Sequence, residues 1–242
     1  MSPALATDQK LLEIVTGPAP DTIGDVIQRM NSIDALLPND DGLKWFNRLY
    51  LFVTTEVQGH HSGDVWKSAA WLMRLDVLFA HLYFGAVAEA VSGSSATPKS
   101  WQALFESRHR PCIDRIQFAL AGMNAHINHD LALALNQVDE EFHMSPRRTS
   151  PEHDDYERVN GLLEEVLPHA LEFLATGILG CVAESTGKVG ELLAIWNVRV
   201  ARDLAWDFSD HLRPLPAFSR SCALDIQDRF TGALGRSILR VI

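Results

Sequence analysis

The chain has 242 residues, of which 47% are hydrophobic and 21% are charged, and its formal net charge is −10. This length and composition predict one large globular domain and exclude a disordered protein. The excess of acidic residues, 31 against 21 basic ones, argues against a nucleic-acid-binding surface.

Two absences favour a cytoplasmic location. The start of the sequence lacks a basic and then apolar run that ends in a small-residue cleavage site. No uncharged apolar run reaches about 18 residues, because Asp76 and His81 interrupt the longest candidate. We therefore expect neither secretion nor a transmembrane segment. The three widely spaced cysteines, Cys112, Cys181 and Cys222, predict reduced core thiols rather than disulfides or a zinc site.

The first half of the chain predicts a loose start followed by long helices. Residues 1–20 end in GPAP and have no sustained period, so we expect a loose N-terminal segment. Apolar spacing predicts an amphipathic helix over residues 21–37 and a mostly buried helix over residues 43–58. Arg48 in the second helix is either a paired side chain or an anion contact.

Residues 64–91 form the longest helical candidate, and Asp76 lies in its most apolar part. A buried carboxylate without a partner is costly, so Asp76 needs a basic side chain or a metal ion nearby. A shorter helix is expected over residues 98–109.

Residues 118–135, FALAGMNAHINHDLALAL, predict a central helix with no water-facing side. At roughly 100° per residue, Asn124 and Asn128 lie on one face, while His126 and His129 lie nearly opposite. Polar side chains in such a helix either tie neighbouring helices together or contact a ligand or metal ion. Asn124, His126, Asn128 and Asp130 are therefore the main candidates for function.

The second half predicts a charged loop and three more helices. Residues 136–153 contain two prolines and are either an active-site lid or a connection. Helices are expected over residues 154–180, with a kink or break at Pro168, over residues 189–212, and from residue 218 to the end. The whole pattern predicts an all-α fold, in which residues 21–242 form a single-domain bundle of about seven to eight helices around a buried central helix. The sequence leaves the oligomeric state open.

The chain lacks a Walker loop, a GxGxxG turn, a GxSxG elbow and an HExxH helix, so the common nucleotide, hydrolase and zinc-protease signatures are missing. Five segments resemble a bacterial and fungal family of unknown function: FNRLY (46–50), LDVLFAHLYF (75–84), ALAGMNAHINHDLALAL (119–135), DYERVN (155–160) and RVARDLAW (199–206). GMNAHIN followed by DL is the most distinctive of these motifs.

This family in turn resembles the non-classical humulene synthases of fungal meroterpenoid pathways. The resemblance implies an all-helical, class I-like terpene cyclase, a lyase in which magnesium (Mg2+) holds the diphosphate of a prenyl substrate. Two departures stand against it. The DDxxD and NSE-type motifs of ordinary class I cyclases are absent, with only a fragment, HDDYE, at residues 153–157, and His81 stands where the family has Asn.

A cyclase needs cations that stabilise the departing diphosphate and a dry pocket with aromatic walls for the carbocation. For catalysis the sequence offers Arg48, Arg199, Arg202, Tyr83 and Trp206. Substrate contacts are expected from Tyr50, Phe79, Asn124 and Trp196. Metal ligands are expected at Asp76, Asn128, Asp130 and His126.

Two alternatives remain open at this point. One is a metal-dependent hydrolase or oxygenase that holds zinc or iron on His81, His126, His129 and Asp130. The other is a non-catalytic binder of an apolar ligand, in which the polar side chains only satisfy one another.

Overall fold

The computed structural model describes residues 3–59, 65–175 and 197–240, and every regular element among them is a helix. The predicted all-α single domain is confirmed. In chain order the elements are α1 (Pro3–Val15), α2 (Ile23–Leu36), α3 (Gly42–Gly59), α4 (Ala69–Val91), α5 (Lys99–Ser107), α6 (Arg115–Ala125), the π-helical turn η1 (His126–Asp130), α7 (Leu131–Glu141), α8 (Pro151–Ala175), α10 (Val198–Leu212) and α11 (Ala217–Ile238).

The predicted central helix is confirmed as the continuous run α6, η1 and α7. A capping box begins it, in which the Asp114 carboxylate accepts from the backbone nitrogen of Ile116 and the Gln117 side chain accepts from that of Asp114. Within residues 118–135 every residue is buried except Asn128 and Leu133, which are partly exposed. This segment has no polar face, and that absence correctly predicted the helix that the others surround.

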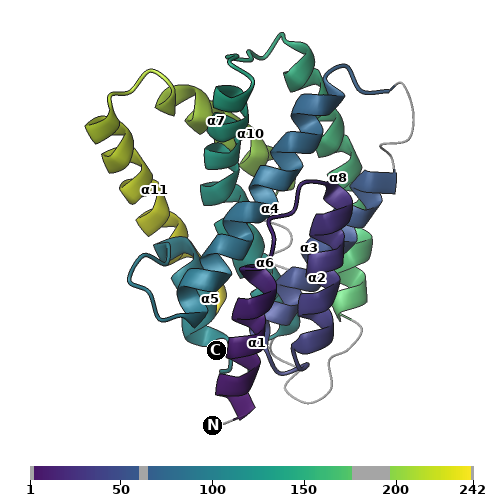
Figure 1. Cartoon of the computed structure of the whole chain (residues 1–242), viewed down its shortest axis with the longest axis vertical. Helices are drawn as coiled ribbons and strands as arrows, with labels where there is room; N and C mark the ends of the chain where they lie inside the picture. The colour runs from purple at the N-terminus through teal and green to yellow at the C-terminus, as the bar shows by residue number, and fades with distance from the viewer. Residues whose placement is uncertain (1–2, 60–64, 176–196, 241–242) are drawn as a thin grey trace.

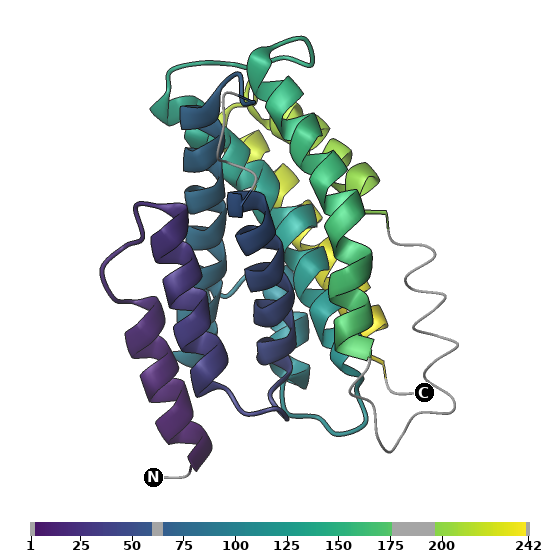
Figure 2. The same cartoon turned by 90° about the vertical axis from the view of Figure 1, so that its right-hand side faces the viewer.

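Helices α3, α4, α5, α8, α10 and α11 contact this central run, and α1 and α2 pack outside it on α3 and α4 (Figure 1). Helix α3 contacts α2, α6 and α8, whereas α10 contacts α7, α8 and η1. Figure 2 shows the central run passing between the N-terminal helices and α8. Helix α11 lies at the edge of the bundle, where it contacts α5, α6 and η1.

The predicted loose segment over residues 1–20 is wrong for Pro3–Val15, which forms α1. Leu11 and Val15 are buried, and Asp8 accepts a hydrogen bond at 2.8 Å from Arg108, which also pairs with the buried Asp41. A buried arginine needs such partners, so this pairing holds α1 to the bundle.

Other boundaries also differ from the sequence prediction. If α6, η1 and α7 count as one helix, the described residues form nine helices, and α1 is the unexpected one. Only residues 142–150 lie between α7 and α8, so half of the predicted loop is helical. Helix α8 continues through Pro168.

Helix α4 is long and apolar enough to cross a membrane by length and composition, but 61% of its most apolar window is buried inside the bundle. A core helix of a water-soluble domain has the same character. The cysteine prediction was partly wrong, because the thiols of Cys112 and Cys222 are exposed rather than in the core. Cys181 lies outside the described residues.

Helices α3 and α6 approach each other closely at glycines. A Cβ atom at Gly122 would lie 2.3 Å from the ring of Phe46, and one at Gly42 would lie 2.3 Å from the ring of Phe118. Each glycine therefore makes room for an aromatic ring of the other helix, and this packing places Phe46 beside the central run.

Gly122→Ala is expected to destabilise the protein by about 1–3 kcal/mol, because the methyl group overlaps the Phe46 ring in a packed core. The matched control is Gly85→Ala on α4, where an added Cβ meets nothing within 4 Å. That control is expected to gain about 0.5–1 kcal/mol, because alanine favours the helix. Urea denaturation of both variants measures the difference, and equal stabilities would contradict the packing.

Candidate functional site

A cavity of about 50 Å³ lies between α3, α4, the central run, α8 and α10. This volume has room for a few water molecules or for a small organic group. Most of its wall is apolar, and its polar side chains come from four different elements. The lining residues are Tyr50, Val53, Thr54, Val57, Asp76, Phe79, Met123, His126, Ile127, Leu163 and Arg202.

His126 enters the cavity wall from the first position of η1, where the central run widens into a π-helical turn. Such turns inside α-helices are frequent at functional sites. The imidazole stacks on Phe79 with ring centroids 3.5 Å apart, and its Nδ1 lies 3.0 Å from Asp130 Oδ2. Among the described residues, the buried Nε2 has no hydrogen-bond partner. It is therefore the ring nitrogen left for a molecule in the cavity.

Asp130 fixes the orientation of that ring. Its Oδ2 also accepts a hydrogen bond from Trp101 Nε1 at 2.9 Å, and its Oδ1 lies 2.8 Å from His129 Nδ1. Although burial favours the neutral acid, the hydrogen bonds from the two histidines lower the pKa of Asp130. An ionised Asp130 accepts from Nδ1–H of His126, which leaves Nε2 as the basic nitrogen.

The two histidines beside Asp130 differ in charge preference. Burial lowers the pKa of His126, and the hydrogen bond and charge of Asp130 only partly oppose this shift. Burial acts in the same direction on His129, but its pKa is raised because Asp130 and Asp228 both favour the imidazolium. At neutral pH, His126 is therefore neutral and can accept a proton.

Asp76 adds a carboxyl group to the cavity from α4. Burial among the apolar lining raises its pKa to about 7, and the charge of Arg202 opposes this shift. At neutral pH, Asp76 is thus close to the midpoint of its titration. The cavity therefore holds both a base and a group able to donate a proton.

Arg202 brings a positive charge from α10, and α8 holds it in place. Its Nε donates a hydrogen bond to Asn160, and its guanidinium lies 4.2 Å from the centre of the Tyr156 ring. Tyr156 in turn donates from its hydroxyl to the backbone oxygen of Arg202 at 2.7 Å. Two of the motifs quoted above, DYERVN and RVARDLAW, thus contact each other directly.

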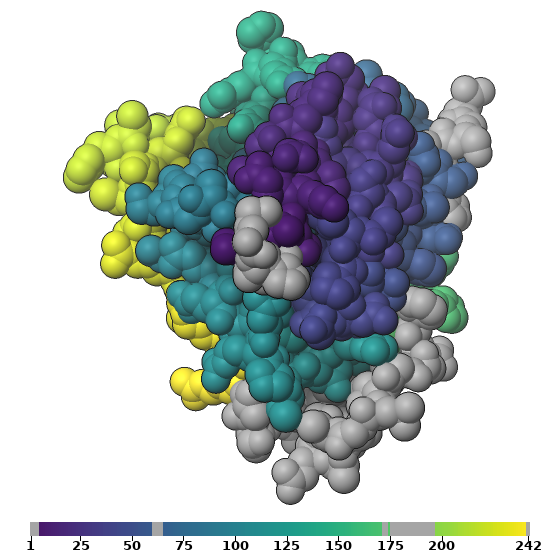
Figure 3. Space-filling view, turned by 60° about the horizontal axis from the view of Figure 1, so that its bottom comes forward, coloured from purple at the N-terminus to yellow at the C-terminus, as the bar shows by residue number. Residues whose placement is uncertain are grey.

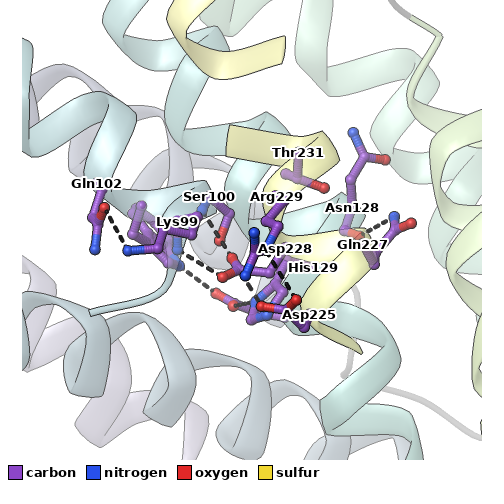
Figure 4. Close-up of polar contacts among 12 residues, drawn as sticks. Lys99, Ser100, Gln102, Asn128, His129, Asp225, Gln227, Asp228, Arg229 and Thr231 are labelled. Atoms are coloured by element: carbon purple, nitrogen blue, oxygen red, sulfur yellow. Dashed lines mark hydrogen bonds and ion pairs between the residues drawn. The ribbon is translucent and has the colours of Figure 1, made fainter. Parts of the chain in front are cut away.

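The opposite side of η1 binds α11 (Figure 4). His129 Nε2 lies 3.7 Å from Asp228 Oδ1, and Gln227 donates to the backbone oxygen of Asn128 at 2.7 Å. Asn124 donates to the backbone oxygen of Thr231 at 2.9 Å. The prediction that His129 shares a face with His126 is therefore wrong, because the π-helical turn inserts one residue and rotates the later side chains about the helix axis.

Five predicted site residues come together at the cavity: Tyr50, Asp76, Phe79, His126 and Arg202. Asp130 lies behind them and acts through His126. Asn124 and Asn128 instead bond to each other and to α11. Trp196 lies outside the described residues.

The remaining predicted catalytic residues do not line this cavity. Arg48 pairs with Asp34 at 2.7 Å, and Arg199 pairs with Glu164 at 2.9 Å. Tyr83 donates to Asn47 in the core at 3.2 Å, and Trp206 packs against Trp71 and Tyr156. His81 was also predicted as a ligand in the zinc or iron alternative. Its Nε2 lies 2.8 Å from the backbone oxygen of Pro20.

Sequence reasoning missed Thr54, Asn160 and Asp228, as well as the apolar lining. Asn160 stood in a quoted motif, and its position four residues after Tyr156 places both on one face of α8. That spacing was the available signal, because both side chains contact Arg202.

The four predicted metal ligands do not converge. Among residues 3–59, 65–175 and 197–240, no group of three or more His, Cys, Asp or Glu side chains is placed to hold a metal ion. Asp76 and His126 line the cavity, but both oxygens of Asp130 already accept hydrogen bonds. This donor set suits a magnesium ion that arrives with substrate phosphates, which often need only one or two protein carboxylates. It does not suit a zinc or iron ion held by the protein alone.

The fold and this cavity define an all-helical domain with a mostly apolar internal cavity beside a π-helical turn. Residues 23–241 match the model of a family of unknown function, DUF5995, and the chain belongs to that family. No curated protein and no solved structure matches the chain significantly. The predicted membership of a family of unknown function is thus confirmed.

Asp76→Asn is expected to change how stability depends on pH. Between the ordinary value of 3.8 and the folded value of about 7, the unfolded chain releases the Asp76 proton while the folded protein keeps it. The free energy of unfolding therefore falls as the pH rises through this window.

The variant lacks this fall, so relative to the wild type it gains on the order of a few kcal/mol between about pH 4 and pH 7. Urea denaturation across this pH range measures the effect, with Asp40→Asn at an exposed position as the control. Parallel profiles for the wild type and Asp76→Asn would show that the carboxyl group is not desolvated.

Proposed function

We propose that this protein is an enzyme that performs acid–base chemistry on a small, largely apolar molecule bound in the His126 cavity. The observation that carries the proposal is His126 Nε2, a buried nitrogen without a partner among the described residues, on a ring whose other nitrogen bonds to Asp130. A neutral imidazole oriented by a carboxylate is a common general base.

In this proposal His126 accepts a proton from the substrate or from a water molecule at Nε2. Asp76, with a pKa of about 7, returns a proton to the product or to the leaving group. Arg202 stabilises negative charge that develops on the substrate, because this residue lines the same wall. The apolar remainder of the wall excludes water and favours a hydrocarbon-like substrate.

A second candidate is the prenyl diphosphate cyclase that the resemblance implies. The aromatic rings of Tyr50 and Phe79 and the charge of Arg202 favour it, because carbocations bind aromatic faces and diphosphates bind arginine. In that case Asp76, the carboxylate in the cavity wall, would contact a magnesium ion carried by the diphosphate. The zinc or iron hydrolase and the non-catalytic binder have no comparable support.

One set of assays distinguishes the two candidate functions. The wild type and His126→Gln are incubated with p-nitrophenyl esters and with geranyl, farnesyl and geranylgeranyl diphosphates, with and without magnesium. The assays follow p-nitrophenol, pyrophosphate and the organic extract. Acid–base catalysis predicts a loss of about 10²–10⁴-fold in His126→Gln, and no loss in His109→Gln, which changes an exposed histidine.

Turnover that survives His126→Gln contradicts the acid–base proposal. Magnesium-dependent release of pyrophosphate that falls in Asp76→Asn, but not in His126→Gln, selects the cyclase. If a ligand co-purifies with the protein and is retained without turnover, the protein is a binder rather than an enzyme.

A further inference from the structure

Arg202 is a buried arginine that forms no ion pair with a carboxylate of the described residues. It is 6% exposed. Arg108, which is buried to a similar extent, pairs with two aspartates. The partners of Arg202 are instead neutral, because its Nε donates to Asn160 and its guanidinium lies 4.2 Å from the centre of the Tyr156 ring. A buried charge without a counter-ion is costly, which points to an anion that binds beside it.

The far end of this guanidinium is available to a ligand. Asn160 occupies Nε, whereas no described residue accepts a hydrogen bond from Nη1 or Nη2. Completely buried polar atoms without a partner occur elsewhere in the described part of the chain, but the two Nη atoms are not among them, so they border open space. Arg202 lines the cavity of about 50 Å³, which provides that space.

Two neutral side chains of α8 fix the direction of the guanidinium. Asn160 and Tyr156 are both 0% exposed. The Tyr156 hydroxyl donates to the backbone oxygen of Arg202 at 2.7 Å, and the Asn160 amide donates to Glu157 at 3.2 Å. These contacts orient the arginine without cancelling its charge, as a binding site for an anion requires.

Asp76, the acidic residue of the cavity wall, does not neutralise Arg202. The charge of Arg202 lowers the pKa of Asp76, but burial has the larger effect and raises that pKa to about 7. A carboxylate in a close ion pair with an arginine would show the opposite shift. Arg202 therefore keeps most of its charge for another anion.

We propose that Arg202 binds the carboxylate of the substrate, and that the substrate is a short aliphatic monocarboxylic acid. This inference rests on the proposed function of the cavity and adds the substrate class. Two parallel hydrogen bonds from Nη1 and Nη2 match the two oxygens of a carboxylate. The hydrocarbon part of the acid then lies against the apolar wall, which is formed by Val53, Val57, Met123, Ile127 and Leu163.

Charge and size both favour a carboxylate over a diphosphate. Among the described residues that line the cavity, Arg202 is the one with a positive charge at pH 7, since the lowered pKa of His126 leaves that ring neutral. One positive charge balances a monoanion, whereas a diphosphate carries several negative charges. A volume of about 50 Å³ admits a carboxylate with a few carbon atoms but not the much larger diphosphate.

The cavity belongs to one side of the bundle. Its described lining residues come from α3, α4, the central run, α8 and α10. None comes from α1, α2 or α5, which cover much of the face seen in Figure 3. A ligand therefore does not enter through that face.

Propionate is the probe for this site, and propionamide is its uncharged counterpart of the same shape. In protein labelled with ¹³C at valine, leucine and isoleucine methyl groups, propionate should shift the signals of Val53, Val57, Ile127 and Leu163. The shifts should saturate with a dissociation constant of roughly 1–10 mM, as expected for a ligand of so few atoms. Propionamide should bind at least about 10-fold more weakly, because it lacks the charge.

Arg202→Met should weaken propionate binding by about 10–100-fold, because the charge-assisted hydrogen bonds are lost. The matched control is Arg199→Met, on the same helix, where the arginine pairs with Glu164 outside the cavity. That control should bind propionate like the wild type. Propionate should also raise the thermal stability of the wild type but not that of Arg202→Met. The comparison with propionamide uses the wild type alone, so it decides the question even if Arg202→Met does not fold.

The binding test and the ester assay fail independently. If propionate does not bind while ester turnover depends on His126, the substrate class is wrong and the acid–base function stands. If propionate binds at Arg202 while turnover is independent of His126, the acid–base function is wrong and the carboxylate site stands.

Four results overturn the proposal. Propionate could cause no saturable shift of the cavity methyl signals up to about 100 mM, or propionamide could bind as tightly as propionate. Folded Arg202→Met could bind propionate like the wild type. Finally, pyrophosphate with magnesium could shift the same methyl signals at a lower concentration than propionate, which would assign Arg202 to a diphosphate instead.

Discussion

The buried carboxylate of Asp130 is the constraint on which both sides of the central run depend. Asp130 is 2% exposed, and a buried charge is costly unless hydrogen bonds surround it. Its donors are Trp101 on α5 and two histidines of η1, His126 and His129. Satisfying this one charge fixes the position of α5, turns the His126 ring to the cavity, and turns His129 toward α11.

The fold could be read from the sequence largely because the central run lacks a water-facing side. A buried helix needs other helices around it, and the apolar spacing of the rest supplied them. The sequence did not predict helix α1, because its packing depends on the distant Arg108, and no local periodicity reveals that contact. The sequence did not predict the π-helical turn either, since a fixed step of 100° per residue assumes an unbroken α-helix. That assumption placed His129 on the wrong face.

The sequence predicted the cavity residues only in part, because periodicity identifies buried positions but not the partners of charged groups. Arg199 and Arg202 are less than one turn apart on α10, yet Arg199 reaches the acidic side of α8 and Arg202 reaches Asn160. The sequence identified Asp76 because a carboxylate is unusual in an apolar helix. In the structure Asp76 lines the cavity. Asn124 and Asn128 looked similar but serve to bind α11.

The protonation state of His126 tests the central claim most directly. In protein labelled with ¹⁵N at histidine, long-range proton–nitrogen correlation spectra distinguish a protonated ring nitrogen from an unprotonated one. Burial and the bond to Asp130 predict a neutral ring at pH 7 with the proton on Nδ1 and an unprotonated Nε2. A proton on Nε2, or a ring that is charged at pH 7, would contradict the account.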